Sequence, residues 1–349
     1  MKIPQKYFVS GYGKKRSMLE TRRFVQGVKT IIPVLAITGR KTGPVAVIMA
    51  CQHGCELNGI SAIERAFNSL EPENMSGMVV FLPVMNPVAV RIQRQDYPSE
   101  AGRYRQSGDD GANMNRTWLR NDTRDTYAGE ITALVWETFL QHADVALDLH
   151  GWSGLSLCLA WSLPQNRQLL REFGLPWHML AVNNNFMCEN AAAKAGIPFI
   201  TCELTPQDTI CNKSVYYGEQ GIYNLLMSSG ILRGKPKLPA VQYEFEQNHV
   251  EHVIKTPVEG LVVSDFEKGQ MIRKGGTVLR ILALDSLKTA YEYKAPENSL
   301  IFNVGATMGN AGFQDSSIVY PGQTVGLLKE PALIINNKQE PIAKLKKRS

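Results

Sequence analysis

Short apolar runs alternate with segments of helical periodicity through the first two thirds of the sequence. Five runs are almost continuously apolar, as expected of strands buried on both faces: residues 45–51, 78–85, 144–149, 155–161 and 198–203. Segments with helical spacing alternate with them: residues 59–69, 129–142, 165–173, 188–195 and 217–229. This alternation predicts an α/β fold in which a mixed, mostly parallel sheet is sandwiched by helices.

The sequence changes character after Gly230. Residues 233–249 contain two prolines and no apolar period, which is typical of a linker. Short strands punctuated by glycine follow, and two stretches echo each other: KTPVEGLVV…KGGTVLRIL and KAPENSLIF…PGQTVGLL. This repeat predicts a small all-β, barrel-like domain made of two similar halves. The predicted organisation is an α/β domain at 1–235, a linker at 236–249, a β domain at 250–330 and a basic tail at 331–349.

The composition excludes several classes of protein. The 38 Lys and Arg residues exceed the 32 Asp and Glu residues by six, a surplus too small to predict nucleic-acid binding. No apolar run approaches the ~20 residues of a membrane span, and residues 1–23 lack the apolar stretch of a secretory signal. Six cysteines in 349 residues do not suggest a disulfide framework. A cytoplasmic protein without a membrane partner is therefore expected.

Candidate metal ligands follow two of the predicted strands. His53 and Glu56 lie three residues apart at a strand-to-helix turn, and His150 ends another buried strand. Catalytic zinc typically takes three protein ligands, so these residues predict a zinc site at the strand ends. Either histidine alone is more typical of a hydrogen-bonded structural residue than of a metal ligand. Cys51 and Cys55 also flank His53, but no second cysteine pair completes a closed four-cysteine site.

Two further signals accompany the candidate metal ligands. A polar, glycine-rich loop runs from Arg105 to Arg116, and Asn115 precedes its second arginine. One guanidinium could stabilise an oxyanion while the other, with the asparagine, grips a carboxylate, although a solvated arginine-rich loop has the same composition. Glu203 closes another apolar strand, where a carboxylate could take a proton from zinc-bound water. On its own, Glu203 is more typical of a helix-cap or salt-bridge residue than of a base.

Taken together, these residues resemble the succinylglutamate desuccinylase/aspartoacylase family, a branch of the zinc carboxypeptidase-like superfamily. The family's five motifs are H-G-x-E-x-N-G, N-P, R-x-x-x-x-D-G-x-D-L-N-R, D-L-H and T-x-E. They correspond here, in the same order, to residues 53–59, 86–87, 105–116, 148–150 and 201–203. The resemblance spans roughly residues 45–231, and the β module after the linker resembles the family's C-terminal domain, which is related to biotinyl/lipoyl carriers.

The resemblance implies a role for each motif residue. The ligands of one Zn²⁺ per chain would be His53, Glu56 and His150. Arg105 would polarise the scissile carbonyl, and Glu203 would act as general base and then general acid. A further set concerns the substrate and the ligand orientation: Asn115 and Arg116 would bind the substrate α-carboxylate, and Asp148 is a candidate to orient His150.

Three departures from the family pattern concern the substrate. Asn113 replaces an acidic residue, Met114 replaces leucine, and Leu-Thr-Pro follows Glu203. These differences leave the zinc chemistry intact and the substrate open. Lys294 precedes Ala-Pro at a predicted strand entry, unlike the modified lysine at the hairpin tip of a carrier domain, so we expect it to be unmodified.

The sequence therefore predicts a zinc-dependent amidohydrolase, a deacylase whose substrate is a small N-acyl amino acid or related acylated amine. Two alternatives stay open: a metallocarboxypeptidase acting on short peptides, and an inactive module that binds a metal or small molecule. The predicted base Glu203 speaks against the second alternative, because a binding module needs no base. Whether the chain forms a homo-oligomer is left open.

Overall fold

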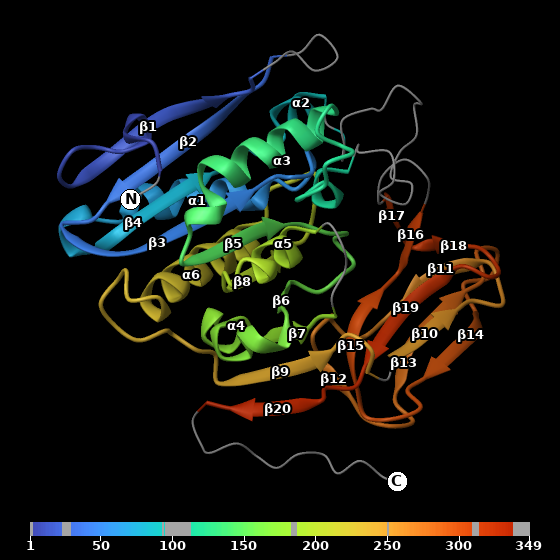
Figure 1. The fold of residues 1–349 in the computed structure, drawn as a ribbon. Helices are drawn as coiled ribbons and strands as arrows, with labels where there is room; N and C mark the ends of the chain where they lie inside the picture. Colours follow the sequence, from blue (N-terminus) through green and yellow to red (C-terminus); the bar gives the residue numbers. More distant parts are fainter. Residues whose placement is uncertain are drawn as a thin grey trace.

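A ten-stranded sheet forms the centre of the computed structural model, which describes residues 3–22, 29–92, 94, 113–182, 187–249, 251–308 and 314–337 (Figure 1). Its strands lie in the order β1 (Gly13–Glu20), β2 (Ile31–Thr38), β4 (Ser76–Leu82), β3 (Lys41–Ala50), β5 (Val145–His150), β8 (Phe199–Glu203), β6 (Leu159–Ser162), β7 (Trp177–Leu180), β9 (Val241–Glu246) and β20 (Leu333–Asn336). The central strands β4, β3, β5 and β8 are mutually parallel, whereas antiparallel pairings occur toward both edges.

The two faces of this sheet carry separate apolar cores. On β3, Val47 and Met49 belong to one core, and Ala46 and Ile48 belong to the other. This alternation is the period of two that a strand imposes on its side chains. Because both faces are covered, the central strands read as continuous apolar runs in the sequence.

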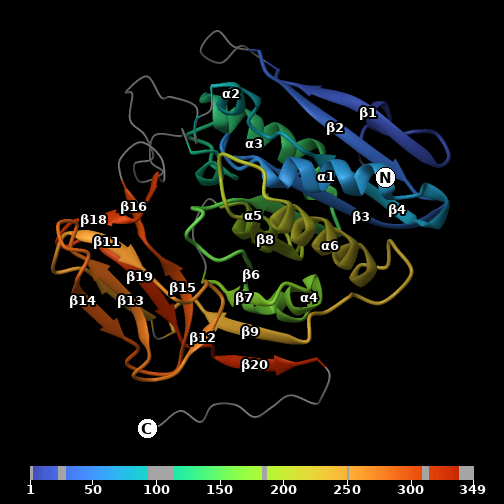
Figure 2. The ribbon, with the colours of Figure 1, turned by 180° about the vertical axis from the view of Figure 1, so that it is seen from behind.

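Helices cover both faces of the sheet. The elements are α1 (Asn58–Ser69), α2 (Pro87–Arg91), α3 (Tyr127–Thr138), α4 (Arg167–Phe173), α5 (Cys188–Lys194) and α6 (Asn212–Ser228), with short 3₁₀ turns at η1 (Gln5–Tyr7), η2 (Pro72–Asn74), η3 (Met114–Arg116), η4 (Leu140–His142) and η5 (Pro164–Asn166). Residues of α3 and α5 join one core, and residues of α1, α4 and α6 join the other. Figure 2 shows α1 and α6 in front of the sheet, on the face opposite α3. No helix in the described part of the chain is long and apolar enough to cross a membrane.

The parallel strands β3, β5 and β8 bring their carboxyl ends to one edge of the sheet. In the register of β5 and β8, His150 lies opposite Glu203 and Asp148 lies opposite Thr201. The turn that follows β3 leaves the sheet at the same edge. Residues far apart in the sequence, from 51–56, 148–150 and 203, are thereby gathered at the strand ends, where α/β sheets commonly bind ligands.

The C-terminal module packs two four-stranded antiparallel sheets against each other. One sheet has the order β10 (Glu251–Lys255), β19 (Thr324–Lys329), β15 (Ser299–Val304) and β12 (Met271–Ile272), and the other has β14 (Thr289–Lys294), β13 (Thr277–Leu282), β11 (Gly260–Val263) and β18 (Ile318–Val319). Strands β11 and β13 carry the first copy of the repeat, and β15 and β19 carry the second. Because each copy occupies the same two positions in its own sheet, the repeat in the sequence is a repeat in the structure. A hairpin of β16 (Ala306–Met308) and β17 (Gln314–Ser316) extends from this module.

The module contacts the α/β part of the chain along the segment after β5. Lys268 donates hydrogen bonds from Nζ to the carbonyl oxygens of Gly154 and, at 2.7 Å, Ser156. The Ser153 hydroxyl donates to Asp315 Oδ1 at 2.5 Å, and Ser156 also forms a β-bridge with Asn303. The module therefore holds the segment that leads directly from His150.

The predicted fold class is confirmed, and two of the predicted irregular stretches need correction. Part of the expected linker at 236–249 forms strand β9, and part of the expected tail at 331–349 forms strand β20, which pairs with it. In β9 polar and apolar residues alternate, so it lacks the apolar run that identified the central strands. Its buried Glu244 pairs with Arg167 and Arg171. The hairpin β1–β2 was also absent from the sequence prediction, and the limits of the domains stay a prediction.

Candidate metal centre and active site

The turn between β3 and α1 carries His53 and Glu56 in a buried position. The Glu56 N–H donates to the carbonyl of His53 at 3.3 Å, which closes the turn. Gly54 lies against α2: a β-carbon at this position would come within 2.2 Å of the carbonyl carbon of Ala89. A side chain at 54 would therefore push the turn away from α2, and glycine allows the two candidate ligands to be buried.

The structure brings His53, Glu56 and His150 together. Their ligand atoms all lie within 4.8 Å of one another. Glu56 lies between the two imidazoles, with Oε1 2.8 Å from His53 Nδ1 and Oε2 2.9 Å from His150 Nδ1. All three side chains are buried. Two imidazoles and one carboxylate form the donor set of many catalytic zinc sites, so these residues fit a divalent metal ion.

The outer nitrogen of each imidazole faces a second polar group. His150 Nε2 lies 2.7 Å from Asp148 Oδ2, and His53 Nε2 lies 3.1 Å from Asn113 Oδ1. Oxygen acceptors at Nε2 favour a proton on that nitrogen, so Nδ1 is the nitrogen that each imidazole would offer to a metal beside Glu56. Asp148 therefore contacts the ring of His150, as its position two residues earlier on the same strand suggested.

Electrostatics at the cluster reflect burial and opposite charges. Burial alone would raise the pKa of Glu56, but the neighbouring imidazoles of His53 and His150 hold that pKa well below its ordinary value. Burial would lower the pKa of His150, yet the carboxylates of Asp148 and Glu56 raise it well above its ordinary value. Without a metal, a proton on His150 offsets part of the negative charge of these carboxylates; a divalent cation would supply positive charge in its place.

A cavity of about 120 Å³ connects the candidate metal ligands with other predicted site residues. Six predicted residues line it: His53, Glu56, Asn115, Arg116, His150 and Glu203. Arg105, the predicted oxyanion residue, lies outside the described residues. Residues predicted from four separate segments of the sequence thus share one cavity in the structure.

The turn η3 holds the two predicted substrate-binding residues. The Asn115 side-chain oxygen accepts a hydrogen bond from the Cys188 N–H at 2.9 Å, which ties η3 to the start of α5. Arg116 donates from Nη1 to the carbonyl of Asn115 at 2.7 Å. These contacts fix the backbone of η3 beside the cavity, so that Arg116 projects from a structured turn.

Several residues of the site were missing from the sequence prediction. Trp152, Trp161 and Met187 also line the cavity. Glu189, in the first turn of α5, is buried, and neither carboxylate oxygen has a hydrogen-bond partner among the described residues. Burial is the main cause that raises the pKa of Glu189, to about 7. The D-L-H-G-W sequence could have indicated Trp152, but no local pattern distinguishes Glu189 from a surface glutamate on a short helix.

A larger cavity, of about 750 Å³, lies elsewhere on the molecule. Its lining includes Lys41 and Val45 from the beginning of β3 and Asp144, which precedes β5. These residues lie at the amino ends of the strands, whereas the candidate metal cluster lies at their carboxyl ends. Because the larger cavity contains no cluster of candidate ligands among the described residues, the smaller one is the candidate active site.

Known proteins resemble this chain in both sequence and fold. Residues 42–229 match the succinylglutamate desuccinylase/aspartoacylase catalytic domain. The N-alpha-acetyl-L-2,4-diaminobutyric acid deacetylase of Halomonas elongata is 26% identical over 298 residues, which cover 80% of this chain and 84% of the relative.

Solved structures share the fold over almost the whole chain. The product-bound ectoine utilization protein EutE (DoeB) from Ruegeria pomeroyi superposes with a TM-score of 0.69 at 20% identity, covering 92% of this chain and 96% of that one. An aspartoacylase family protein from Mesorhizobium loti gives a TM-score of 0.68 at 22% identity, covering 91% and 95%. The match to the catalytic domain covers more than half of this chain, so the chain belongs to the succinylglutamate desuccinylase/aspartoacylase family.

Proposed function

We propose that the protein is a zinc-dependent deacylase that hydrolyses the amide bond of a small N-acyl amino acid. One observation carries the proposal: the cluster of His53, Glu56 and His150 lines the same small cavity as Glu203 and Arg116. The cavity therefore combines candidate metal ligands, a candidate base and a cation suited to a carboxylate. Membership of a family of deacylases supports the same reaction class.

The residues of the cluster would hold one zinc ion. His53 and His150 would bind it through Nδ1 and Glu56 through its carboxylate, since these atoms converge. When bound, the ion supplies Lewis acidity toward the amide carbonyl and lowers the pKa of water. The cluster offers nitrogen and carboxylate donors without a thiolate, a set that suits zinc in hydrolytic sites.

Glu203 would move the proton during hydrolysis. It ends β8 directly opposite His150 on β5, and its side chain lines the cavity. A carboxylate there can accept a proton from the attacking water and then donate it to the departing amine. These two transfers allow the amine to leave as a neutral group.

Arg116 and Asn115 would position the substrate by its α-carboxylate. The guanidinium of Arg116 can form two parallel hydrogen bonds with a carboxylate. The backbone of η3 is fixed by Asn115, so the bound carboxylate would be held at a constant distance from the cluster. Arg105 keeps its proposed role at the scissile carbonyl on the basis of its motif position alone.

The size of the cavity favours a small substrate over a peptide. A volume of about 120 Å³ among the described residues accommodates only a few non-hydrogen atoms. The relative from Halomonas elongata is a deacetylase of N-alpha-acetyl-L-2,4-diaminobutyric acid, which suggests a similarly small acyl group here. The peptide-trimming alternative would require a wider groove.

Metal analysis combined with a substrate panel tests this function. The purified protein should contain one zinc per chain and release the amine from at least one N-acetyl, N-succinyl or N-formyl amino acid. Glu203→Gln should retain zinc and lose nearly all turnover, whereas His150→Ala should lose both. Full activity of Glu203→Gln would show that another group is the base, and hydrolysis of unacylated dipeptides alone would favour the carboxypeptidase alternative.

A further inference from the structure

We propose that Gln52 and Trp118 are positioning residues that fix the tautomer of His150 and so direct its Nδ1 toward the metal. The proposal rests on the proposed metal site and adds two residues that the sequence motifs do not include. It follows from a continuous chain of hydrogen bonds that begins at the Trp118 indole and ends at the His150 ring. The indole N–H at the start of this series of hydrogen bonds determines which group donates and which accepts at each step.

The Trp118 indole fixes the direction because its N–H can only donate. Nε1 of Trp118 lies 2.9 Å from Gln52 Oε1. With its oxygen engaged there, the Gln52 amide presents its NH₂ group to Asp148 Oδ2, to which it donates. The orientation of the Gln52 amide is thus determined by the Trp118 indole N–H, which cannot act as an acceptor.

Asp148 transmits this direction to His150. Its Oδ2 accepts from Gln52 and lies 2.7 Å from His150 Nε2. An ionised carboxylate only accepts, and Asp148 Oδ2 lies closer to Nε2 than the Asn115 amide nitrogen does at 3.4 Å, so the proton between Asp148 and His150 belongs to Nε2. Nδ1, whose distance to Glu56 Oε2 is 2.9 Å, is then the nitrogen at which a metal would take the place of a proton.

Because these hydrogen bonds are buried, the loss of one of them should cost more than the loss of a hydrogen bond at the surface. Trp118, Gln52, Asp148 and His150 are each at most 4% exposed. Water therefore cannot replace a lost partner, and in such surroundings an unpaired polar group is expensive. Asp148 Oδ1 has no partner among the described residues, so this carboxylate depends on the two contacts at Oδ2.

The histidine on the other side of the cluster has a parallel arrangement. The backbone N–H of Asn115, which can only donate, lies 3.0 Å from Asn113 Oδ1. This contact identifies the atom facing His53 Nε2 at 3.1 Å as an oxygen, so Nε2 of His53 carries the proton. Both tautomers are therefore set from the same short segment, residues 113–118.

A structural role for Trp118 alone would not require this pattern. Its ring belongs to an apolar core, and phenylalanine would fill most of the same space. The N–H, however, lies next to a buried glutamine whose other end meets the carboxylate of the metal-ligand partner. The backbone of Gln52 is independently held by Asn86, whose Nδ2 donates to its carbonyl at 3.1 Å. Hydrogen bonds thereby hold both the backbone and the side-chain amide of Gln52.

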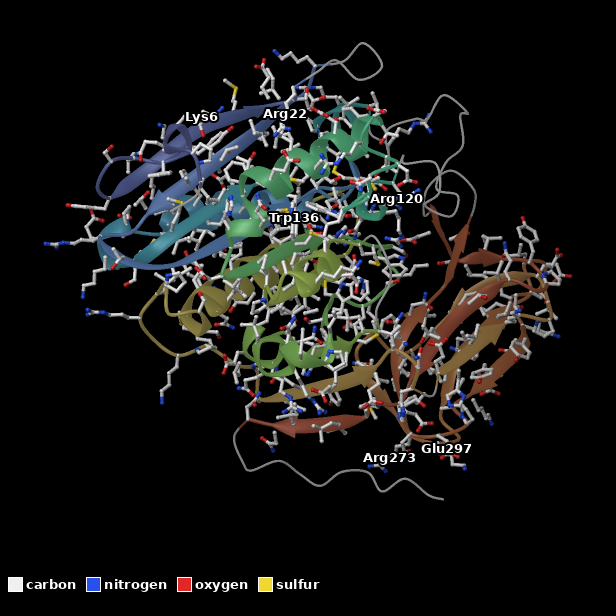
Figure 3. The ribbon with its side chains drawn as sticks, viewed as in Figure 1. Lys6, Arg22, Arg120, Trp136, Arg273 and Glu297 are labelled. Carbon is white, nitrogen blue, oxygen red and sulfur yellow. The ribbon has the colours of Figure 1, made fainter. Side chains whose placement is uncertain are left out.

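Zinc affinity and the ring protons of the histidines test the proposal. Competition with a chromophoric chelator should show Gln52→Glu binding zinc about 10–100-fold more weakly, the usual effect of losing an outer partner of a metal ligand. Trp118→Phe should weaken binding by about tenfold, at the low end of that range. Trp136→Phe is the matched control, because Trp136 packs against the same core from α3 (Figure 3) and takes no part in the chain.

Nitrogen-15 NMR of the zinc-loaded protein provides a readout that loss of packing would not move. The parent and Trp136→Phe should show His150 protonated at Nε2, and Trp118→Phe should show a shifted or exchanging Nε2 proton. Unchanged zinc affinity and an unchanged His150 spectrum in Trp118→Phe would overturn the proposal, even if Gln52→Glu fails to fold. Because neither measurement uses a substrate, a protein that binds zinc but hydrolyses no acyl amino acid would refute only the proposed reaction.

Discussion

The buried carboxyl of Glu189 should make the stability of this protein fall as the pH rises toward neutrality. Both oxygens lack hydrogen-bond partners among the described residues, and the side chain is buried. Burial, opposed in part by His150 and Arg116, raises the pKa of Glu189 from 4.5 to about 7. Glu189→Gln replaces this carboxyl with a neutral amide of nearly the same shape, so it isolates the consequence of ionisation.

The sign and size follow from the difference in proton binding. Between pH 4.5 and about 7 the folded protein retains the Glu189 proton more tightly than the unfolded chain. Stability contributed by this carboxyl is therefore fully present below pH 4.5 and is lost as the pH rises through 7. The shift of about 2.5 units, at roughly 1.4 kcal/mol per unit, corresponds to about 3 kcal/mol.

Urea denaturation of the metal-free parent and of Glu189→Gln over a pH series measures this difference directly. Relative to the variant, the parent should lose about 3 kcal/mol of unfolding free energy across the titration, most of it between pH 5 and 7. Glu71→Gln, which removes an exposed carboxylate, is the control for loss of one charge. A difference between parent and Glu189→Gln that does not vary with pH would refute the reasoning, because it would mean that Glu189 ionises normally.

Three further substitutions probe the candidate substrate site, the β module and the start of helix α1, which follows the turn with the candidate metal ligands. Arg116→Lys should raise KM for an acyl amino acid by about tenfold with little change in zinc content, since lysine cannot form the two parallel hydrogen bonds; an unchanged KM would remove Arg116 from substrate binding. Lys268→Met removes the hydrogen bonds to Gly154 and Ser156. The substitution should raise KM more than it lowers kcat. Steady-state constants identical to those of the parent would show that the hydrogen bonds from Lys268 do not shape the cavity. Gly59→Ala should destabilise the fold by about 1–3 kcal/mol in thermal unfolding, because the new β-carbon would lie 2.8 Å from β-carbons in β3 and β5; an unchanged Tm would contradict this.

The sequence predicted the central fold because burial on both faces leaves a strong signal. Strands β3, β4, β5 and β8 are apolar runs, and their order of occurrence with helices specifies an α/β sandwich. Strands β9 and β20 lie toward the edge of the sheet, where only one face needs apolar side chains. Buried Glu244 in β9 is compensated by arginines from α4, a contact that no local pattern in the sequence reveals.

The candidate site was predictable where the chemistry depends on residue type and motif order. His53, Glu56, His150 and Glu203 follow strands that become neighbours in the sheet, so strand prediction and motif reading lead to the same residues. The supporting residues were missed because their roles depend on tertiary contacts. Trp118 follows a turn far from β5 in sequence, and only the folded chain places its indole N–H against Gln52.

Asn113 shows how the chain departs from its family's pattern without losing the geometry of the cluster. The pattern has an acidic residue at this position, yet the asparagine oxygen meets His53 Nε2 as a carboxylate oxygen could. Three carboxylates already lie within electrostatic reach of His150: Glu56, Asp148 and Glu189. A fourth, at residue 113, would add a negative charge to a buried region where unpaired charge is costly. A carboxylate partner increases the basicity of an imidazole ligand more than an amide does, so His150 should be the stronger and His53 the weaker donor to a bound metal. The asparagine thus preserves the tautomer of His53 while limiting the negative charge around the cluster.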